Sequence, residues 1–423
     1  MSPRSAEKLA GPALRRAVRR NTALLAGALA VNSATLQLAA AIASITFVEV
    51  TGIRALLGLG PAVFLTAGAL TSLPAGRAMD RFGRVPVLAG GFGLGAGGAA
   101  ITGLAVGADS APLTILGFAL IGSASGVALL ARTAAGDMYP PERRGRGIGL
   151  VLFGAVFGAI LGPSVFGPLF AGKDVDAETL TAPWLVASGF MLVGLALVLA
   201  VRPEPKRIGE ALASGGGEPG APAAPLTAIL RRPGALAALL AALASFSVMA
   251  ALMNLVSYVV VEEHGHHQAD VFPIVGAHVF GMYALVLVVG TAIDRVGRRP
   301  ALVGGLLVMA LASALLASAE GVAATAFLLF ALGIGWNLSF VAATATLADV
   351  ATVSERGKLL GFNDLGSSLL AAALVLLGGL VVEALGPAVL ALAGTTLVLL
   401  PAVWILRPAA APREHATSPT PGA

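Results

Sequence analysis

The phrase GRAMDRFGRVP, from Gly76 to Pro86, returns as GTAIDRVGRRP from Gly290 to Pro300. Each copy follows a long apolar run, and the two copies lie 214 residues apart. A second pair of loops repeats at almost the same distance, since GDMYPPERRGRGIG begins at Gly136 and ADVATVSERGKLLG begins at Ala348, 212 residues later. Two independent loops therefore predict that the chain consists of two related halves.

The composition is that of a membrane protein. Hydrophobic residues make up 57% of the 423 residues and charged residues only 12%, about half the charged fraction of an ordinary soluble domain. A soluble core of this size would need more charged surface, so the expected solvent is lipid. The chain has no cysteine, which excludes disulfides, thiolate metal sites and a thiol nucleophile. No G-x-x-x-x-G-K-[ST] loop is present, so an ATP-driven pump is disfavoured, an enzyme is the least favoured class, and no cofactor is expected.

Apolar runs separated by short polar clusters predict an all-α membrane protein with twelve transmembrane helices in two six-helix pseudo-symmetric bundles. The runs lie near residues 22–48, 55–76, 85–107, 112–135, 148–170, 183–201, 235–261, 271–291, 300–319, 321–347, 359–382 and 387–406. Each is ~19–27 residues long, enough to cross a ~30 Å hydrocarbon core with some tilt. The predicted divisions are a basic cytoplasmic tail (1–21), an N-terminal bundle (22–201), a cytoplasmic linker (202–234), a C-terminal bundle (235–407) and a disordered tail (408–423).

Lysine and arginine are distributed unevenly between the two sides of the predicted helices. If the N-terminus is cytoplasmic, all but two of the 27 basic residues lie inside, the exceptions being Arg54 and Lys173. This positive-inside pattern predicts a multi-pass protein of the plasma membrane with both termini in the cytoplasm. The basic loops are expected to attract anionic lipid, so the net charge of +5 calls for no nucleic-acid partner.

On these motifs the chain resembles the major facilitator superfamily over essentially its whole length. In that family the cytoplasmic loop between helices 2 and 3 carries a G-x-x-x-D-R-x-G-R pattern, and both copies of the repeated phrase match it. The resemblance implies a gate that locks the two halves together in one conformation, formed here by Gly76, Asp80, Arg81, Gly83 and Arg84 and by Gly290, Asp294, Arg295, Gly297 and Arg298. The second pair of loops adds Asp137 and Arg144, which align with Asp349 and Arg356.

The chemistry of the phrase suits such a gate. A glycine lets a neighbouring backbone approach closely. A carboxylate can satisfy the exposed amides of a facing helix N-terminus, and arginines can pair with that carboxylate or with lipid phosphate. Two parallel halves imply a pseudo-two-fold axis along the membrane normal and a central cavity that opens alternately to each side.

The fifth predicted helix is similar to that of the drug/proton antiporter branch of this family, which carries G-x8-G-x3-G-P-x2-G-G. The matching residues are Gly149, Gly158, Gly162, Pro163 and Gly167, whereas Phe166 replaces the first glycine of the final pair. Proline in a membrane helix frees a carbonyl and bends the helix, and glycines allow close contact. The resemblance therefore implies an antiporter-type exporter with twelve helices.

The proton-carrying residues of that branch cannot be transferred to this chain. Drug–proton antiporters carry an arginine midway along the fourth helix, and the corresponding stretch around Phe118 has none. Ionisable residues inside membrane spans are costly, which makes Asp364 and His278 the candidate proton sites. Asp364 is expected ~9 Å into the eleventh helix from the inside, and His278 ~10 Å into the eighth from the outside. The alternatives are an acid paired with basic cytoplasmic loops and a packing histidine, respectively.

In this family helices 1, 4, 7 and 10 line the central cavity. The resemblance therefore assigns the substrate cavity to polar residues of these helices, among them Asn32, Gln37, Asn254, Tyr258, Trp336 and Asn337. None of them is charged, so neutral, lipophilic or amphipathic substrates are favoured over phosphates and carboxylates. The alternative for each residue is a hydrogen bond between helices.

The loop EEHGHHQAD, residues 262–270, holds three of the five histidines of the chain. Histidine and carboxylate side chains are zinc ligands. The short loop contains a glycine and implies no ordered tetrahedral geometry, so a solvated loop is favoured and no metal site is expected.

The favoured interpretation is a secondary active transporter that exports small lipophilic or amphipathic compounds by alternating access, with proton antiport as the expected coupling. Its expected partners are a small-molecule substrate, protons and the lipid bilayer, and the chain is expected to be a monomer. Two alternatives remain open. One is a facilitator or symporter for a neutral metabolite, and the other is a membrane sensor or scaffold that does not transport.

Overall fold

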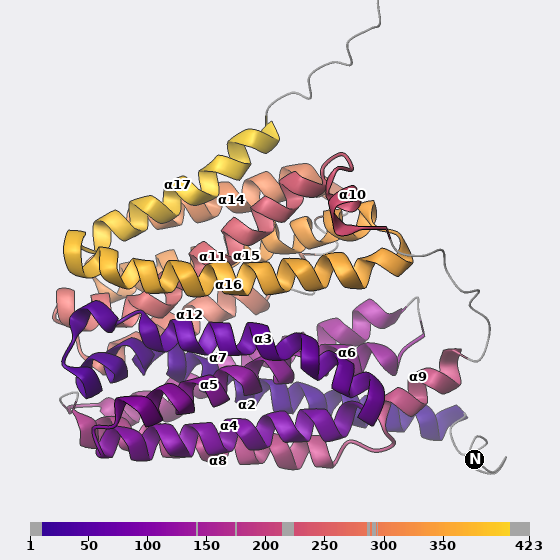
Figure 1. The fold of residues 1–423 in the computed structure, drawn as a ribbon, viewed down its shortest axis with the longest axis horizontal. Coiled ribbons are helices and arrows are strands. Elements are labelled where there is room, and N and C mark those ends of the chain that lie inside the picture. Colours follow the sequence, from indigo (N-terminus) through magenta and orange to yellow (C-terminus); the bar gives the residue numbers. More distant parts are fainter. Residues whose placement is uncertain are drawn as a thin grey trace, which may run out of the picture.

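The computed structural model describes residues 11–140, 143–173, 176–213, 224–285, 288–289, 293 and 295–406. In this part of the chain the regular elements are helices, and the long ones run roughly parallel (Figure 1). The first half contains α2 (Gly11–Thr51), the short turn η1 (Arg54–Leu56), α3 (Leu59–Phe82), α4 (Arg84–Gly107), α5 (Ala111–Leu129), α6 (Ala131–Asp137), α7 (Arg144–Phe170) and α8 (Ala177–Leu199). The connection contains α9 (Pro205–Ala213) and α10 (Leu226–Leu230). The second half contains α11 (Ala235–Tyr258), the π-helical turn η3 (Val259–Glu263), α12 (Gln268–Tyr283), α14 (Arg298–Leu316), α15 (Val322–Val350), α16 (Val353–Leu385) and α17 (Pro387–Leu406).

The long helices have the length and surface of membrane spans. Eleven helices of the described residues are long and apolar enough to cross a bilayer. Large apolar side chains such as Leu104, Leu311 and Phe327 project outward from them. A soluble monomer rarely exposes so many large apolar side chains, whereas lipid covers them at no cost. The prediction of an all-α membrane protein is therefore confirmed.

The helices pack as two bundles in the order that the repeat predicts. In the first half α2 packs along α7, and α4 packs against α5 and α8. In the second half α14 packs against α15 and α17, and α12 packs along α15. Figure 1 shows the first half, coloured indigo to magenta, below the second half, coloured salmon to yellow. The halves meet where α7 packs against α12 and α3 packs against α16.

Several predicted boundaries differ from the structure. The first helix begins at Gly11 rather than near residue 22, because arginine is a good helix former and the basic segment continues the apolar helix. The fourth predicted run, 112–135, is divided between α5 and α6 at Leu130. The eleventh begins at Val353 rather than 359, because Thr352 and Glu355 form a capping box there.

Two further regions differ in extent. The predicted linker contains the helices α9 and α10, so it is not a plain flexible connection. The eighth predicted run, 271–291, corresponds to α12, a helix of 16 residues. Part of that run lies outside the described residues, so the count of twelve membrane helices stays a prediction. The predicted tails lie outside them as well, except for residues 11–21.

The bundle has two chemically different ends. We call the end that carries Arg84, Arg143 and Arg298 the basic end, and the end that carries Gly58 and Gly386 the opposite end. Both connecting helices lie at the basic end, at the right of Figure 1.

Candidate functional site

Both copies of the repeated phrase turn at the same glycine. The φ angle is 102° at Gly83 and 97° at Gly297, a region that favours glycine because a Cβ would be strained there. Each glycine immediately precedes a long helix, α4 in the first half and α14 in the second. The phrase is therefore repeated in part because it encodes a tight turn. A Cβ at Gly76 would meet no atom within 4 Å, so the close approach expected there is not seen in this arrangement.

The charged residues of the first copy form a network inside the first half. Arg84 donates from Nη1 to Asp80 at 2.8 Å and from Nε to Asp137 at 2.7 Å, which joins α3, α4 and α6. The Arg84 side chain is only 12% exposed, so these two carboxylates compensate a largely buried charge. Glu204, which precedes α9, accepts the backbone N–H of Arg84 at 2.5 Å and caps the N-terminus of α4.

The second copy repeats the central contact of this network. Arg298 donates from Nε to Asp349 at 3.1 Å. These two residues are the repeat counterparts of Arg84 and Asp137, so the alignment of the second pair of loops corresponds to a real contact in both halves. In each half, therefore, an arginine–aspartate contact joins the glycine turn to the end of a neighbouring helix.

The remaining predicted gate residues form few contacts or lie outside the described residues, and Asp80 is largely exposed despite its pair with Arg84. Arg81 and Arg295 are exposed, and the Arg81 guanidinium lies 5.1 Å from the centre of the Phe82 ring. The Asp80 side chain is 76% exposed. Outside the described part of the chain lie Gly290 and Asp294, together with the side chains of Arg144 and Arg356.

An ion pair at the basic end joins the two halves. Arg132 on α6 donates from Nη2 to Asp364 on α16 at 3.1 Å. The two side chains are 33% and 46% exposed, so both are partly accessible to water. Asp364 lies eleven residues after Val353, the first residue of α16, or about 16 Å along the helix. The apolar span of this helix begins at Lys358, so Asp364 lies six residues, or about 9 Å, into it, which agrees with the expected depth.

The two halves meet tightly at the opposite end. A Cβ on Gly58 would lie 2.3 Å from the carbonyl oxygen of Val375, so the backbones of the two halves touch directly. Gly379 faces the same point, and a Cβ there would lie 2.8 Å from the Gly58 nitrogen. Nearby, the Phe272 ring of α12 stacks on the Phe170 ring of α7 with centroids 5.5 Å apart. Sequence reasoning missed both glycines, because an approach between distant segments leaves no local signal.

The glycines of the predicted antiporter motif pack α7 against α2. A Cβ on Gly158 would lie 2.5 Å from the Cβ of Ser33, and one on Gly162 would lie 3.0 Å from the Gln37 amide. Gln37 donates from Nε2 to the Gly158 carbonyl. This predicted cavity residue therefore serves, at least in part, as a contact between helices.

The proline of the motif faces the second half. Pro163 leaves the Ala159 carbonyl without its helical donor. A Cβ on Gly276 of α12 would lie 2.7 Å from Cγ of Pro163 and 3.1 Å from that carbonyl oxygen. The motif thus contacts its own half through α2 and the other half through α12. Gly149 and Gly167 are half-buried.

Five of the six predicted cavity residues have a buried polar atom that finds no hydrogen-bond partner among the described residues. These atoms are Asn32 Oδ1, Gln37 Oε1, the Tyr258 hydroxyl, Trp336 Nε1 and Asn337 Oδ1. The sixth, Asn254, donates to the Ala250 carbonyl of its own helix at 2.8 Å. An unpaired buried polar group costs free energy, and a polar ligand would relieve this cost.

Aromatic side chains from three helices surround the predicted contact residue Trp336. Its indole stacks on Phe340 at 5.2 Å and lies 6.2 Å from the Tyr283 ring and 6.4 Å from the Phe246 ring. The last three rings are half-buried. We call these four residues the aromatic cluster, and sequence reasoning identified only its tryptophan.

The second proton candidate has a different environment. His278 is fully buried, and its Nδ1 lies 2.7 Å from the Leu329 carbonyl on α15. A Cβ on Gly333 of the same helix would lie 2.5 Å from the His278 carbonyl oxygen. This tight packing inside one half favours the alternative of a packing histidine.

The histidine-containing loop has ordinary structural contacts. His266 Nε2 lies 2.7 Å from the Glu320 carbonyl. His267 and Asp270 form a capping box at the start of α12. Across the residues that the structure describes, no group of three metal-ligating side chains comes together.

A further ion pair at the basic end stabilises the second half. Arg232 donates from Nη1 to Glu355 at 2.6 Å and from Nη2 at 2.9 Å, a bidentate contact. The Glu355 side chain is buried and also accepts the backbone N–H of Thr352. The Arg232 guanidinium, followed by the backbone amide, holds the pKa of the Glu355 carboxyl well below its usual range.

We expect Glu355→Gln to lower the unfolding temperature by a few degrees at neutral pH. The folded-state pKa is depressed, so the stabilisation is present above the ordinary carboxyl pKa of 4.5 and is lost as the pH falls towards the folded-state value. The difference between wild type and variant should therefore shrink below about pH 4.5. Thermal unfolding in detergent between pH 3 and 8 measures this, with the exposed Glu383→Gln as control. A constant difference across that range would contradict the assignment.

The match to a known family explains this arrangement. The family model "Major Facilitator Superfamily" matches residues 23–286 and 263–422. The chain belongs to the Major Facilitator Superfamily. It is therefore a multi-pass integral membrane transporter and not an enzyme, and its substrate is a small molecule.

Individual members of this superfamily are similar over most of their length. The uncharacterised transporter YdeG of Bacillus subtilis (strain 168) is 29% identical over 359 residues, which cover 83% of each chain. The riboflavin transporter RfnT of Brucella anthropi is 27% identical over 349 residues, or 82% of this chain and 85% of that one. The crystal structure of a D-xylose–proton symporter has a TM-score of 0.70 at 17% identity and covers 92% of this chain and 97% of the other, which supports the fold.

Proposed function

We propose that this transporter exports small lipophilic or amphipathic compounds across the plasma membrane by alternating access, with its basic end in the cytoplasm. The orientation is supported by the distribution of arginine and lysine, which favours the cytoplasmic side. The halves touch at the opposite end through Gly58 and Gly379. We take the structure to represent an inward-facing conformation that is closed at the opposite end, in which the Arg132–Asp364 pair still bridges the halves on the cytoplasmic side.

The aromatic cluster is the observation that carries this proposal. Four aromatic rings from three helices offer flat apolar surfaces, and the Trp336 and Asn337 side chains offer an unpaired donor and an unpaired acceptor. Such a surface binds ring-containing neutral or cationic compounds, and none of the four cluster residues carries the positive charge that a phosphate or carboxylate would need. The similarity to RfnT, a riboflavin transporter, supports a ring-containing substrate.

The gate residues support the conformational cycle. In the arrangement described here the Asp80–Arg84–Asp137 network lies inside the first half, and Asp80 remains largely exposed. In the proposed cycle, this carboxylate would meet the second half when the basic end closes. The repeated phrase would then lock the two halves in the outward-facing conformation.

Proton coupling is proposed to run through Asp364. Its carboxylate pairs with Arg132 across the two halves and is partly accessible to water. Protonation would remove the charge that Arg132 requires and so would release the pair. His278 is the weaker candidate because it is buried inside the second half.

The test is efflux of a panel of lipophilic cationic dyes from cells that express the protein, with and without a protonophore. We expect efflux that the protonophore abolishes. We also expect Trp336→Ala to reduce efflux by about tenfold, because the indole is the centre of the aromatic cluster. The matched control is Trp404→Ala, since this exposed tryptophan of α17 faces outward.

Two outcomes would redirect the proposal. Equal losses in the Trp336 and Trp404 variants would remove the aromatic cluster as a substrate site. Efflux that ignores the protonophore, together with uptake into proteoliposomes down a concentration gradient, would favour a facilitator for a neutral metabolite.

A further inference from the structure

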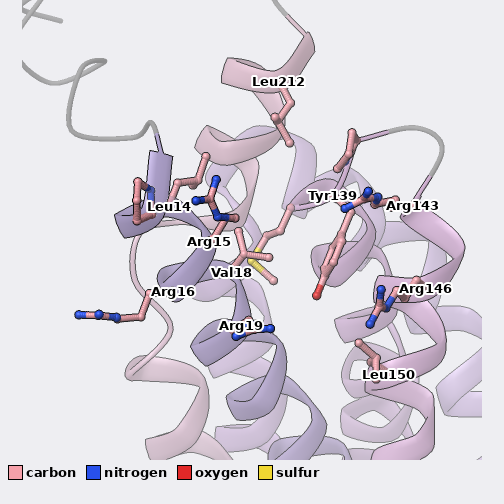
Figure 2. Close-up of a pocket in the computed structure, with 13 residues that line it drawn as sticks. Leu14, Arg15, Arg16, Val18, Arg19, Tyr139, Arg143, Arg146, Leu150 and Leu212 are labelled. Carbon is pink, nitrogen blue, oxygen red and sulfur yellow. The ribbon is translucent and has the colours of Figure 1, made fainter.

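A second site lies at the basic end of the first half, away from the aromatic cluster. A cavity of about 630 Å³ lies between the start of α2, the α6–α7 connection and α9. Its polar lining is dominated by four arginines, Arg15 and Arg19 of α2, Arg143 immediately before α7 and Arg146 of α7; a fifth, Arg16, also lines it but points away from the others (Figure 2). Its apolar lining includes Leu150 of α7 and Leu212 of α9.

Among the residues that the structure describes, no acid neutralises Arg15, Arg19, Arg143 or Arg146. All four are exposed. Arg15 and Arg19 are four residues apart on one helix, a spacing at which like charges repel. The first turns of α2 and α7 contain no acidic residue. Positive side chains at a helix N-terminus are unfavourable unless an anion lies nearby.

The cavity is also continuous with an apolar strip on the outside of α7. Leu150, Phe157 and Ile160 are exposed, and their spacing places them on one face of the helix together with Arg146. The faces of α7 that contact α2 and α12 lie elsewhere, at Gly158 and at Ala159 and Pro163. The strip therefore faces lipid, and it begins at Leu150, which also lines the cavity.

The length of α2 places the cavity at the depth of lipid headgroups. This helix has 41 residues, or about 60 Å, roughly twice the thickness of a hydrocarbon core. Its first turns therefore extend past the hydrocarbon at the basic end. An arginine-lined cavity at headgroup depth, open to an apolar strip, matches the two parts of a phospholipid.

We propose that this cavity binds one anionic phospholipid of the cytoplasmic leaflet, with its phosphate among the four arginines and an acyl chain along Leu150, Phe157 and Ile160. The wall of the cavity is held by Tyr139, whose hydroxyl hydrogen-bonds the Thr22 hydroxyl at 3.1 Å. The bound lipid would neutralise the arginines and join α2, α7 and α9. It is a structural ligand of the first half and not the transported substrate.

The test is lipid binding to the purified full-length protein in detergent, followed by native mass spectrometry. The probes are dioleoylphosphatidylglycerol, dioleoylphosphatidylcholine and inorganic phosphate. We expect one phosphatidylglycerol to bind in preference to phosphatidylcholine. The triple variant Arg15→Gln/Arg19→Gln/Arg146→Gln should bind it about tenfold more weakly, whereas Arg77→Gln/Arg207→Gln/Arg231→Gln, which removes three exposed charges elsewhere, should bind normally.

A second variant and a second measurement test the acyl chain and guard against misfolding. Leu150→Gln should weaken binding of the dioleoyl lipid while it leaves the four arginines in place. In the wild-type protein, phosphatidylglycerol should slow hydrogen exchange in residues 14–19 and 146–150, and phosphatidylcholine should not.

Three results would overturn the proposal. Equal binding by the two triple variants would show a general charge effect. Displacement of the lipid by millimolar inorganic phosphate would identify a site for a free anion. Unchanged hydrogen exchange in these segments would place the lipid elsewhere.

Discussion

Replacing Gly58 with alanine should prevent the halves from closing at the opposite end. The new Cβ would lie 2.3 Å from the Val375 carbonyl oxygen and 2.9 Å from the Leu376 Cα, and both are backbone atoms that cannot rotate away. Overpacking of this kind costs about 1–3 kcal/mol. The population closed at the opposite end should therefore fall by roughly 5- to 150-fold, and transport should fall with it because the cycle needs this state.

The absence of native cysteine makes this measurement direct. A single cysteine introduced at Ile45, which is buried in the apolar cluster at the opposite end, reports whether that end is open. We expect a membrane-impermeant maleimide to label Ile45→Cys slowly, and to label it faster when Gly58→Ala is added. Gly97→Ala is the matched control, because a Cβ there meets nothing within 4 Å. Equal labelling rates in the presence and absence of Gly58→Ala would contradict the contact.

Replacing Asp364 with asparagine should uncouple transport from the proton gradient. The Arg132–Asp364 pair is partly exposed, so it contributes little to stability, roughly 0–1 kcal/mol, and the variant should fold. Without a titratable carboxylate the pair cannot respond to protons. Transport driven by a pH gradient should fall by about tenfold or more, in line with the usual contribution of a positioned proton-transfer group. Asp364→Glu should restore most of it.

A control assay distinguishes a loss of proton coupling from a loss of the conformational cycle. Substrate counterflow in proteoliposomes needs the conformational cycle but no proton gradient. We expect Asp364→Asn to retain counterflow and His278→Gln to retain both counterflow and pH dependence. Loss of counterflow in Asp364→Asn would make the pair a structural contact, as its sequence context also allows.

The sequence was sufficient to predict the fold because the signals for membrane helices and for the repeated turn are local. Apolar runs define membrane helices wherever they occur, and the repeated turn has a physical requirement, positive φ, at Gly83 and Gly297. The predicted helix boundaries were wrong where another local signal extended a helix beyond its apolar run. The arginines before residue 22 extend α2, and the capping box of Thr352 and Glu355 extends α16.

The candidate site could be predicted only in part. Trp336 was recognised as an amphipathic residue at a plausible depth, but its partners Phe246, Tyr283 and Phe340 come together only through the packing of three helices. Asp364 was recognised as a charge in a membrane span. Its partner Arg132 is 232 residues away, and no pattern in one sequence reports such a separation.

The single long helix α2 has a mechanical consequence. It is attached to the second half near the opposite end, where Ser44 donates to the Asn254 carbonyl at 3.0 Å. Towards its other end, about 40 Å along the helix from Ser44, it carries Arg15 and Arg19. Because α2 packs along α7 and α8, it moves with the whole first half, so a small tilt at the Gly58 contact becomes a larger displacement of these arginines through the headgroup layer. The charge density and viscosity of the inner leaflet would then slow the transport cycle.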